Sequence, residues 1–491
     1  MRIVRTDGLA GIVVAATMLA AVVPAAAQKT RTQTFDQDPG WEGVNNLSVQ
    51  KLEPATVKQD FGYSRTHNAG GKAPGEIGGY IEQAGEAAFY GKRIEVKTLD
   101  EPLSASGVFA AADGPFHVQL GFFNAQTTNE WRTPNTLGLR IQGRGDHLYV
   151  FADYCTSKWR AGGQLFTDDI ENRTSSRAKP IEFASGGRTH QWSIRYDPGA
   201  NGGRGAIIAT FDDKTAVCDL DSGHKDDGAR FTHFGIMNVM KSYDRGTQFW
   251  VDDVTINGQT ESFDEDPNWQ GHRNRATWQS RIVRPRFDFG YSPTHFAGGK
   301  NQGEMGGQIF RGDCRYPERM ACYGDRIGPL TLDKPLKASG KIAFRRGVTD
   351  STTCFGFYNS TDSMRSNPSQ DNAIGECVVG IHIEGPSSEG FCFYPVYRGK
   401  GAVSGSGNPR QFPHIYPDGA SHDWSLEYNP DGAGGNGQIT VTLDGQSRTI
   451  DLAAGFKTSG ATFDRFGIIT TWIDGNSQDV YWDDLTYTVS Q

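Results

Sequence analysis

Short segments that alternate apolar and polar residues dominate this chain of 491 residues. Residues 438–445 read QITVTLDG, so that Ile439, Val441 and Leu443 point to one side of an extended chain before an Asp-Gly turn. Residues 137–143 alternate in the same way. No amphipathic helix longer than about three turns, the usual globular length, is recognisable. The pattern therefore predicts an all-β protein built from many short strands.

One polar, glycine-rich stretch occurs twice. Residues 61–79 read FGYSRTHNAGGKAPGEIGG, and residues 289–307, which lie 228 positions later, read FGYSPTHFAGGKNQGEMGG. The correspondence continues to the end of the chain, where WVDDVT at residues 250–255 is matched by YWDDLT at residues 481–486. A match of this density indicates an internal duplication.

The two repeats follow each other directly. FDQDPGW at residues 35–41 opens the first repeat, and FDEDPNW at residues 263–269 opens the second. We therefore place the first repeat at residues 28–262 and the second at residues 263–491. Each has roughly 230 residues, an ordinary size for one domain. No linker rich in proline or serine separates them, so we expect two tandem β-sandwiches packed close together.

The first 27 residues have the features of a secretory signal peptide. Arg2 and Arg5 precede an apolar core at residues 9–23, and Ala-Ala-Ala at residues 25–27 fits the cleavage rule. A single membrane anchor is the alternative. We expect export to the periplasm or the cell exterior, and no membrane contact after cleavage.

Charge and cysteine content narrow the class of protein. A net charge of −8 and a pI near 5.8 argue against a general nucleic-acid or anionic-membrane binder. The seven cysteines are an odd number, and an exported chain is able to form disulfides. Cys314 and Cys322 flank a short insert at residues 315–321, and we predict a disulfide between them.

A fourth pair of matching motifs carries a resemblance to known folds. HQWSIRY at residues 190–196 and HDWSLEY at residues 422–428 are each followed by a strand that ends in a turn with Asp, and then by the closing Asp-Asp strand. This order resembles the concanavalin A-like lectin/glucanase (LamG-like jelly-roll) sandwich. The resemblance covers both repeats and implies polysaccharide binding or cleavage on one sheet, with a structural Ca²⁺ in many members. It assigns no activity.

The repeated signature offers acid–base groups. Glu76 is a candidate acid or base, His67 a proton carrier, and Tyr63 a substrate-facing ring. Glu304 is the counterpart of Glu76 in the second repeat. The alternative is architectural: the glycines form tight turns, and the glutamate accepts hydrogen bonds from backbone amides.

A basic and aromatic group of residues occurs only in the first repeat. Arg140 and Gln142 share one face of a predicted strand, because side chains alternate along an extended chain. Arginine forks hold carboxylates in two-point contacts, which suggests an acidic glycan as the ligand. A solvated sheet face with scattered arginines explains the pattern equally well. The predicted substrate-binding set is Tyr63, His67, Arg132, Arg140, Gln142, Arg144, Trp159 and Arg160.

The second repeat has different side chains at the corresponding place. His382 and Glu384 stand where Arg140 and Gln142 stand in the first repeat. With Glu304 they form an alternative site, in which His382 and Glu384 serve as base and acid. An ordinary polar pair on the rim of a sheet explains them equally well.

Acidic residues at the two ends of each repeat are candidate calcium ligands, because Ca²⁺ prefers carboxylate oxygens. Turn formation by Asp-x-Asp-Pro is the alternative. The candidate ligands are Asp36, Asp38, Asp253, Asp264, Asp266 and Asp484.

These features predict an exported protein that acts on a polysaccharide. A lyase of an acidic glycan would use Arg140 to neutralise a uronate, with His147 or Tyr154 transferring the proton. A hydrolase would need two carboxylates, of which Glu76 is one candidate without an obvious partner. The other hypotheses are a glycan-binding protein without catalysis and a structural protein of the cell envelope.

Overall fold

The structure is a computed structural model that describes residues 29–48, 53–128, 132–284, 286–365, 374–385, 388–401, 403–471 and 475–490. The predicted signal peptide at residues 1–27 lies outside these residues. No helix in the described ranges is long and apolar enough to cross a membrane.

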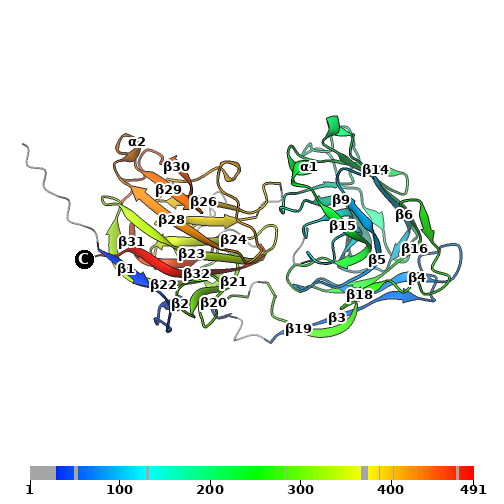
Figure 1. Cartoon of the computed structure of the whole chain (residues 1–491), viewed down its shortest axis with the longest axis horizontal. Helices are drawn as coiled ribbons and strands as arrows, with labels where there is room; N and C mark the ends of the chain where they lie inside the picture. Colours follow the sequence, from blue (N-terminus) through cyan, green and yellow to red (C-terminus); the bar gives the residue numbers. More distant parts are fainter. Residues whose placement is uncertain are drawn as a thin grey trace, which may run out of the picture.

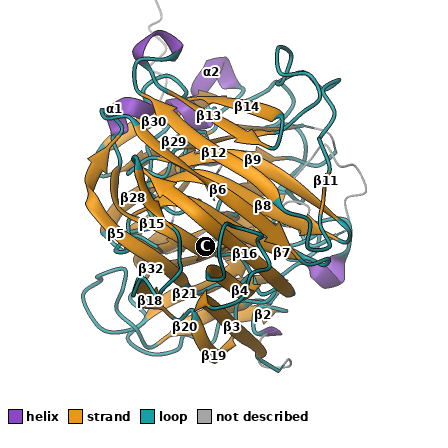
Figure 2. Cartoon of the chain, turned by 90° about the vertical axis from the view of Figure 1, so that its right-hand side faces the viewer, coloured by secondary structure: helices purple, strands orange, loops and turns teal. Residues whose placement is uncertain are grey.

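Four antiparallel sheets form two β-sandwiches, which lie side by side (Figure 1). Strands account for most of the ordered backbone, and the few helices are single turns between them (Figure 2). The predicted all-β architecture is confirmed. We name each sheet after one of its strands.

The first sandwich consists of the β8 sheet and the β6 sheet. The β8 sheet has the order β10 (Ala161–Leu165), β9 (His147–Cys155), β8 (Thr136–Arg144), β7 (Phe116–Phe123), β15 (Arg230–Asn238), β5 (Phe89–Thr98) and β18 (Gln270–His272), with β11 (Phe183–Ala184) on β9. The β6 sheet has the order β14 (Lys214–Asp219), β13 (Ala206–Phe211), β12 (His190–Asp197), β6 (Leu103–Ala111), β16 (Gly246–Ile256), β4 (Glu76–Glu82), β3 (Ala55–Ser64) and β19 (Arg275–Ser280), with β17 (Gln259–Glu261) on β16.

The second sandwich consists of the β25 sheet and the β23 sheet. The β25 sheet has the order β2 (Glu42–Val44), β22 (Cys322–Thr331), β31 (Thr462–Ile469), β24 (Thr352–Tyr358), β25 (Val378–Glu384), β26 (Cys392–Arg398) and β27 (Ser404–Ser406). The β23 sheet has the order β20 (Asp288–Ser292), β21 (Glu304–Phe310), β32 (Ser477–Thr488), β23 (Leu336–Gly347), β28 (Ser421–Asn429), β29 (Gln438–Leu443) and β30 (Gln446–Asp451), with β1 (Thr30–Gln33) on β32. The short helices are η2 (Asn201–Gly203), α1 (His224–Asp227), η3 (Pro317–Arg319), η4 (Pro409–Gln411) and α2 (Gly432–Gly435).

The alternating sequence pattern explains how each sandwich fills its core. On β29, Ile439, Val441 and Leu443 are buried in the second core, as the sequence predicts. On β8, Leu137, Leu139 and Ile141 are buried in the first core. The residues between them on β8 therefore face outward from the sandwich.

The boundary between the repeats is not the boundary between the sandwiches. The first strands of the chain, β1 and β2, pair with β32 and β22 of the second sandwich. The first strands of the second repeat, β18 and β19, pair with β5 and β3 of the first sandwich. Figure 1 shows the blue N-terminal strands beside the red C-terminal strand. We call residues 29–48 the N-terminal strap.

Aromatic packing anchors the strap. Phe35 is fully buried in the second core, and Trp41 packs against Phe35, Tyr323 and Tyr487 with ring-centroid distances of 5.1, 5.8 and 6.1 Å. A Cβ atom on Gly303 would lie 1.9 Å from the carbonyl oxygen of Phe35, so only glycine permits this approach. The strap is therefore part of the second core.

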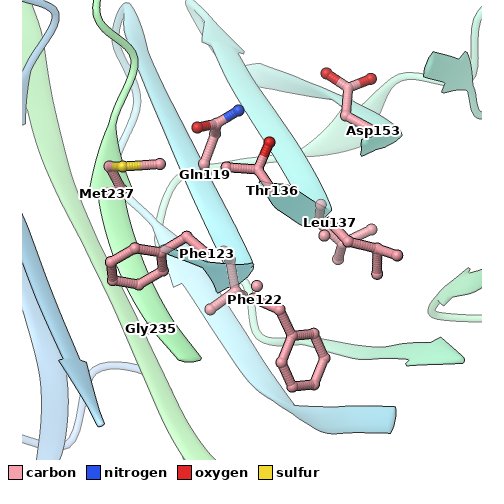
Figure 3. A pocket seen from close by; sticks show the side chains of 12 residues that line it. Gln119, Phe122, Phe123, Thr136, Leu137, Asp153, Gly235 and Met237 are labelled. Carbon is pink, nitrogen blue, oxygen red and sulfur yellow. The ribbon is translucent and has the colours of Figure 1, made fainter. Parts of the chain in front are cut away.

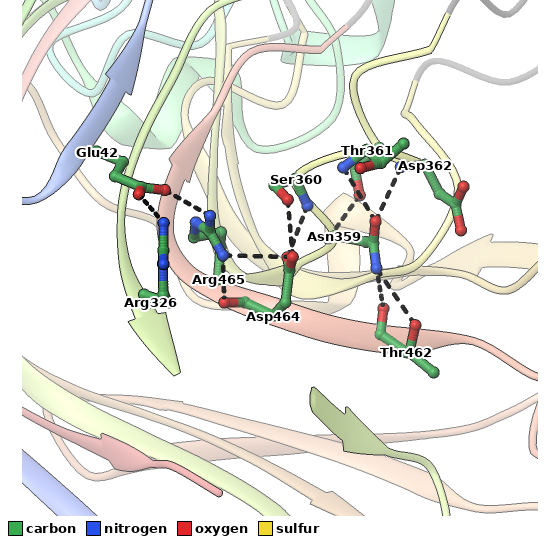
Figure 4. Close-up of polar contacts among 10 residues, drawn as sticks. Glu42, Arg326, Asn359, Ser360, Thr361, Asp362, Thr462, Asp464 and Arg465 are labelled. Carbon is green, nitrogen blue, oxygen red and sulfur yellow. Dashed lines mark hydrogen bonds and ion pairs between the residues drawn. The ribbon is translucent and has the colours of Figure 1, made fainter. Parts of the chain in front are cut away.

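Polar contacts fix the position of the strap. Glu42 on β2 forms ion pairs with Arg326 and Arg465 of the second sandwich (Figure 4). The Asn46 side chain donates a hydrogen bond of 2.6 Å to the Phe289 carbonyl oxygen. Asn274 donates to the Phe61 carbonyl oxygen at the same distance in the first sandwich. The leading segment of each repeat thus docks in the same way, on the sandwich that is made mainly by the other repeat.

The cysteines correct one prediction. The structure has no disulfide between Cys314 and Cys322. Cys322 begins β22, and its side chain packs on the outer face of the β25 sheet among Cys354, Tyr358 and Ile469. All seven cysteines are buried.

Circular permutation tests the role of the strap. In the first sandwich, Ile256 pairs with Gln259 across the two-residue turn Asn257-Gly258. Tyr487 and Arg31 pair in the same way in the second sandwich, so the same turn should be able to join them. A chain opened between Ser48 and Glu53, with Tyr487 joined to Arg31 by Asn-Gly, should keep both calorimetric melting transitions within a few degrees of the native chain.

Deletion of residues 29–48 should have the opposite effect. Truncation of one buried aromatic side chain costs about 3–5 kcal/mol, and the deletion removes the buried Phe35 together with the partly buried Trp41. We expect the transition of the second sandwich to fall far below that of the first in scanning calorimetry. An unchanged second transition would show that the strap is dispensable.

Candidate functional site

A row of glycines crosses the outer face of the β8 sheet. Gly91, Gly235, Gly121 and Gly138 lie opposite one another on adjacent strands. A Cβ atom on any of the last three would lie 2.3–2.4 Å from a carbonyl oxygen of the next strand. These positions, the glycine strip, therefore exclude side chains of their own. Gly91, Gly121 and Gly235 are nevertheless buried, because an apolar cluster that includes Phe123 and Met237 lies on this part of the face.

The strip leads to Asp153, which pairs with Gly138. A pocket of about 20 Å³ lies here, enough for one water molecule (Figure 3). Its walls include Gln119, Thr136, Asp153 and Met237. Two oxygen atoms at the pocket, Gln119 Oε1 and Asp153 Oδ1, have no hydrogen-bond partner in the described part of the chain. The pocket therefore offers buried acceptors to a donor group.

Asp153 belongs to a buried charged cluster. The Arg140 Nε atom lies 2.5 Å and the Arg132 Nε atom 3.5 Å from Asp153 Oδ2. Burial works against the charge of Asp153, but the two arginines hold its pKa below the usual value. Arg140 also donates to His117 Nε2 at 2.9 Å. Burial and the charge of Arg140 lower the pKa of His117 well below its usual value, so His117 is neutral and accepts this bond.

The cluster continues toward the β8–β9 hairpin as a series of cation–aromatic pairs. The Arg140 guanidinium lies 3.7 Å from the centre of the Phe151 ring, and that of Arg144 lies 5.7 Å from the centre of the Tyr149 ring. Gln142 stands between them, opposite Tyr149. Arg132, Arg140, Gln142 and Arg144 thus lie on one face, as the strand pattern predicts for Arg140 and Gln142.

A fourth cation approaches this face from the loop after β15. Lys241 is largely buried, and burial together with the charge of Arg140 lowers its pKa to about 8. The charges of Arg140, Lys241, Arg144 and Arg132 all act on His117. We call the outer face of the β8 sheet around these residues the basic face.

The predicted catalytic residues do not meet in one site. His147 and Tyr154 are seven residues apart on β9, about 23 Å along an extended strand, and an odd separation puts their side chains on opposite faces. His147 Nδ1 contacts Asp146 at 3.0 Å near the hairpin. Glu76 belongs to the other sheet of the sandwich.

Glu76 has an architectural environment. It is fully buried and accepts hydrogen bonds from the backbone amides of Asn68 and Ala69 at 2.9 and 2.7 Å and from the Thr66 hydroxyl. Glu304 accepts the same bonds from residues 294–297. Both carboxylates close the signature loop, as the architectural interpretation predicts. In that loop the exposed His67 ring contacts the Ala73 carbonyl oxygen at 3.1 Å, and the Tyr63 hydroxyl is buried.

Three further predicted residues meet at the boundary between the sandwiches. The Tyr154 hydroxyl contacts His224 Nδ1 at 2.9 Å. Trp159 stacks on Tyr416 of the second sandwich with a centroid distance of 5.6 Å. Arg160 forms an ion pair with Asp227. These three residues are separate from the basic face.

The corresponding face of the second sandwich is filled. Its glycine row, Gly324, Gly467, Gly356 and Gly380, is covered by an apolar cluster that includes Tyr358. His382 and Glu384 do share the outer face of β25, where Glu384 accepts from the Tyr394 hydroxyl and contacts Arg311 at 3.2 Å. Burial raises the pKa of Glu384 and lowers that of His382 to about 3.

The predicted calcium ligands are distributed over both sandwiches. Asp36 and Asp38 lie in the strap on the second sandwich, with Asp484 rather than with Asp253. Each of the six accepts a hydrogen bond from an amide or hydroxyl group. No group of three or more His, Cys, Asp or Glu side chains within the described ranges is arranged to hold a metal.

Their neighbours Asp252 and Asp483 fit a cation better. Both are fully buried at a bulge in the closing strand, and one oxygen of each, Oδ2, has no partner among the described residues. A Cβ atom on Gly71 or Gly299 would lie 2.0 or 1.9 Å from that oxygen, so the Gly-Gly of the signature makes room for it. The pairs Asp252-Asp253 and Asp483-Asp484 are recognisable in the sequence, but only the structure shows that the first aspartate of each pair is the buried one.

Sequence reasoning missed Asp153, His117 and Lys241. His117 and Asp153 alternate with apolar residues on β7 and β9, which marks them as outward-facing. Only the strand register shows that Asp153 lies next to Arg140. Lys241 is in a loop, and nothing in the sequence indicates its position.

Comparisons with known proteins add a fold-level similarity. No family model and no curated protein matches this chain. Similar solved structures include domains LG4-5 of the mouse laminin α1 chain, at 11% identity over 82% of this chain and 90% of that chain with a TM-score of 0.21. They also include endo-β-1,4-glucuronan lyase from the fungus Trichoderma reesei, at 11% identity over 42% and 90% with a TM-score of 0.30. Peanut lectin matches at 12% identity over 41% and 90% with a TM-score of 0.26.

The sheet topology confirms the predicted pair of antiparallel β-sandwiches. The identities and TM-scores are too low to transfer a ligand or an activity to this chain.

The buried aspartates predict a pH dependence. Burial raises the pKa of Asp252 to about 6 and that of Asp483 to about 7, against about 3.9 in an unfolded chain. The folded state therefore binds these protons more tightly, and stability falls as pH rises from about 4 to 7. In buffer with a chelator, Asp483→Asn should reduce the loss of melting temperature between pH 5 and pH 8. The exposed Asp431→Asn is the control, and equal pH profiles for Asp483→Asn and the native chain would contradict the assignment.

Proposed function

We propose that the protein is exported and binds an acidic polysaccharide on the basic face of the first sandwich. The observation that carries this proposal is the convergence of Arg132, Arg140, Arg144 and Lys241 on one sheet face of a protein whose net charge is −8. Such a concentration of positive charge attracts an anionic ligand, although Asp153 neutralises part of it.

The groups on this face suit a carbohydrate with carboxylate substituents. Arginine presents a planar fork that matches a carboxylate in two-point contacts. Tyr149 and Phe151 are partly exposed beside the guanidinium groups, where their rings add apolar contact area for a sugar.

Binding without catalysis is the function that the geometry supports best. The described part of the basic face has no pair of free carboxylates, and His117 already accepts a bond from Arg140. His147 packs on Tyr149 at the hairpin end of this face, with a centroid distance of 5.2 Å, and its Nδ1 atom contacts Asp146. Tyr154 and Glu76 lie elsewhere. A lyase or a hydrolase would need a proton-transfer group beside the scissile bond.

Affinity measurements with uronate oligosaccharides test the proposal. Arg144→Ala, which removes an exposed fork, should weaken binding about tenfold, equivalent to about 1.4 kcal/mol. Binding should also weaken as salt is raised, since screening reduces attraction between exposed charges. Arg448→Ala, an exposed arginine of the second sandwich, is the matched control.

Two results would contradict the binding proposal. Equal affinity of Arg144→Ala and the control would remove the basic face as the binding site. Formation of new reducing ends during incubation, with or without the ultraviolet absorbance of unsaturated uronates, would make the protein a lyase or a hydrolase.

We further propose that each sandwich holds a structural Ca²⁺ at the carboxylate of Asp252 or Asp483. The support is the buried Oδ2 atom of each aspartate, which has no partner among the described residues and lies beside the Gly-Gly turn of the signature. A bound cation would hold the aspartate in its charged form and would secure the signature loop against the closing strand.

Calcium titration of the melting transitions tests this second proposal. Ca²⁺ should raise both transitions of the native chain, because a ligand that binds only the folded state stabilises it. Asp252→Asn should abolish the shift of the first sandwich alone, and Asp483→Asn that of the second. Transitions that do not respond to Ca²⁺ would leave the two aspartates as buried neutral acids.

A further inference from the structure

A polar cleft lies between the two sandwiches. It has a volume of about 470 Å³, within the range of sites for small molecules. Both sandwiches contribute to its walls. The lining residues are Arg160, Arg204, Asp221, Ser222 and His224 from the first sandwich and Ser388, Glu389, Arg410 and His414 from the second.

Ion pairs hold the guanidinium groups of the cleft in place. Asp227 binds Arg160 at two points, with distances of 2.6 Å from Nε and 2.7 Å from NH2. On the opposite wall, the Nε atom of Arg410 donates to Glu389 at 2.6 Å. Within the described chain, the NH1 group of Arg160 and both terminal groups of Arg410 make no hydrogen bond that competes for a ligand. Each wall of the cleft thus presents hydrogen-bond donors whose positions are fixed by an ion pair.

Direct contacts between the sandwiches fix the width of the cleft. His224 Nε2 donates to the Ser388 carbonyl oxygen at 3.0 Å, while its Nδ1 atom accepts from the Tyr154 hydroxyl at 2.9 Å. The stack of Trp159 on Tyr416 adds a second contact. A Cβ atom on Gly390 would lie 3.3 Å from the side chain of Arg160, so the seam is close-packed. The cleft is therefore formed in advance of binding.

The charge of the cleft decides which ligand it suits. Three arginines, Arg160, Arg204 and Arg410, are balanced by three carboxylates, Asp221, Asp227 and Glu389. Burial lowers the pKa values of His224 and His414, so neither ring adds charge at neutral pH. An anion would meet the carboxylates, and a cation would meet the arginines. A neutral molecule with many hydroxyl groups uses both the donors and the acceptors without burying a net charge.

We propose that the cleft between the sandwiches binds a neutral saccharide through its hydroxyl groups. The donors are the free groups of Arg160 and Arg410, and the acceptors are the carboxylates of Asp221 and Glu389. This site is distinct from the basic face and does not depend on the proposed binding of an acidic glycan there.

Titration calorimetry with neutral tetrasaccharides of glucose, xylose and mannose tests the proposal. At least one should bind, and Arg410→Ala and Glu389→Gln should each weaken that binding at least about tenfold. Trp159 lies beside the cleft, so binding should change tryptophan fluorescence in the native chain and not in Trp159→Phe. Arg448→Ala should bind as the native chain does.

The variants separate this proposal from that for the basic face. Arg410→Ala should leave binding of uronate oligosaccharides unchanged, and Arg144→Ala should leave binding of neutral saccharides unchanged. The proposal is overturned if none of the three neutral sugars binds, or if their binding is lost in Arg144→Ala but kept in Arg410→Ala. Retention of the native melting transitions in each variant shows that a loss of binding is not a loss of folding.

Discussion

The docking of the N-terminal strap on the second sandwich is the interaction on which the rest of the structure depends. Strand β32 ends the chain, and without β1 the edge of its last residues would be unpaired. Phe35 and Trp41 complete the core beneath that edge. In the first sandwich the same place is filled by the segment that follows directly after β17. The first and last strands, β1 and β32, thus pair in one sandwich. This pairing covers a strand edge that could otherwise pair with another chain.

The pairing of the strap with β32 also affects the order in which the two sandwiches fold. The first sandwich is built from residues 55–280, which are continuous in sequence, whereas the second needs residues 29–48 and residues from 287 onward. Contacts between such distant segments carry a large loop-closure cost and form slowly. The strap precedes the whole first sandwich in the chain, whereas its partner strand β32 follows it. The first sandwich can therefore be complete while the second still lacks its closing strands.

The repeat, the strand pattern and the shared face of Arg140 and Gln142 could be predicted because each depends on local periodicity. The partner of the strap could not, because residues 35–41 and 263–269 carry the same motif and fit either sandwich equally well. The role of Glu76 depended on whether Asn68 and Ala69 turn their amides toward it, which is a property of the folded loop. The proximity of Asp153 to Arg140 likewise follows from strand register, which the alternating pattern does not specify.

The two repeats share the residues that build the scaffold and differ in those on the outer sheet face. The buried glutamate, the Gly-Gly turn and the aspartate bulge are the same in both repeats. In each repeat these residues hold the signature loop against the last strand. The outer sheet faces differ, although both retain four aligned glycines. The second repeat fills its strip with Cys354, Tyr358 and Ile469, so that its outer face is closed by apolar packing. In the first repeat Phe123 and Met237 lie on the strip, and charged groups are buried beside it at a cost in desolvation. Both sandwiches carry a buried arginine that is paired with carboxylates, Arg140 with Asp153 in the first and Arg311 with Asp350 and Glu384 in the second. In the first sandwich the further cations Arg132, Arg144 and Lys241 lie around this pair. These additional cations, rather than the buried pair itself, are the structural support for a ligand on the basic face.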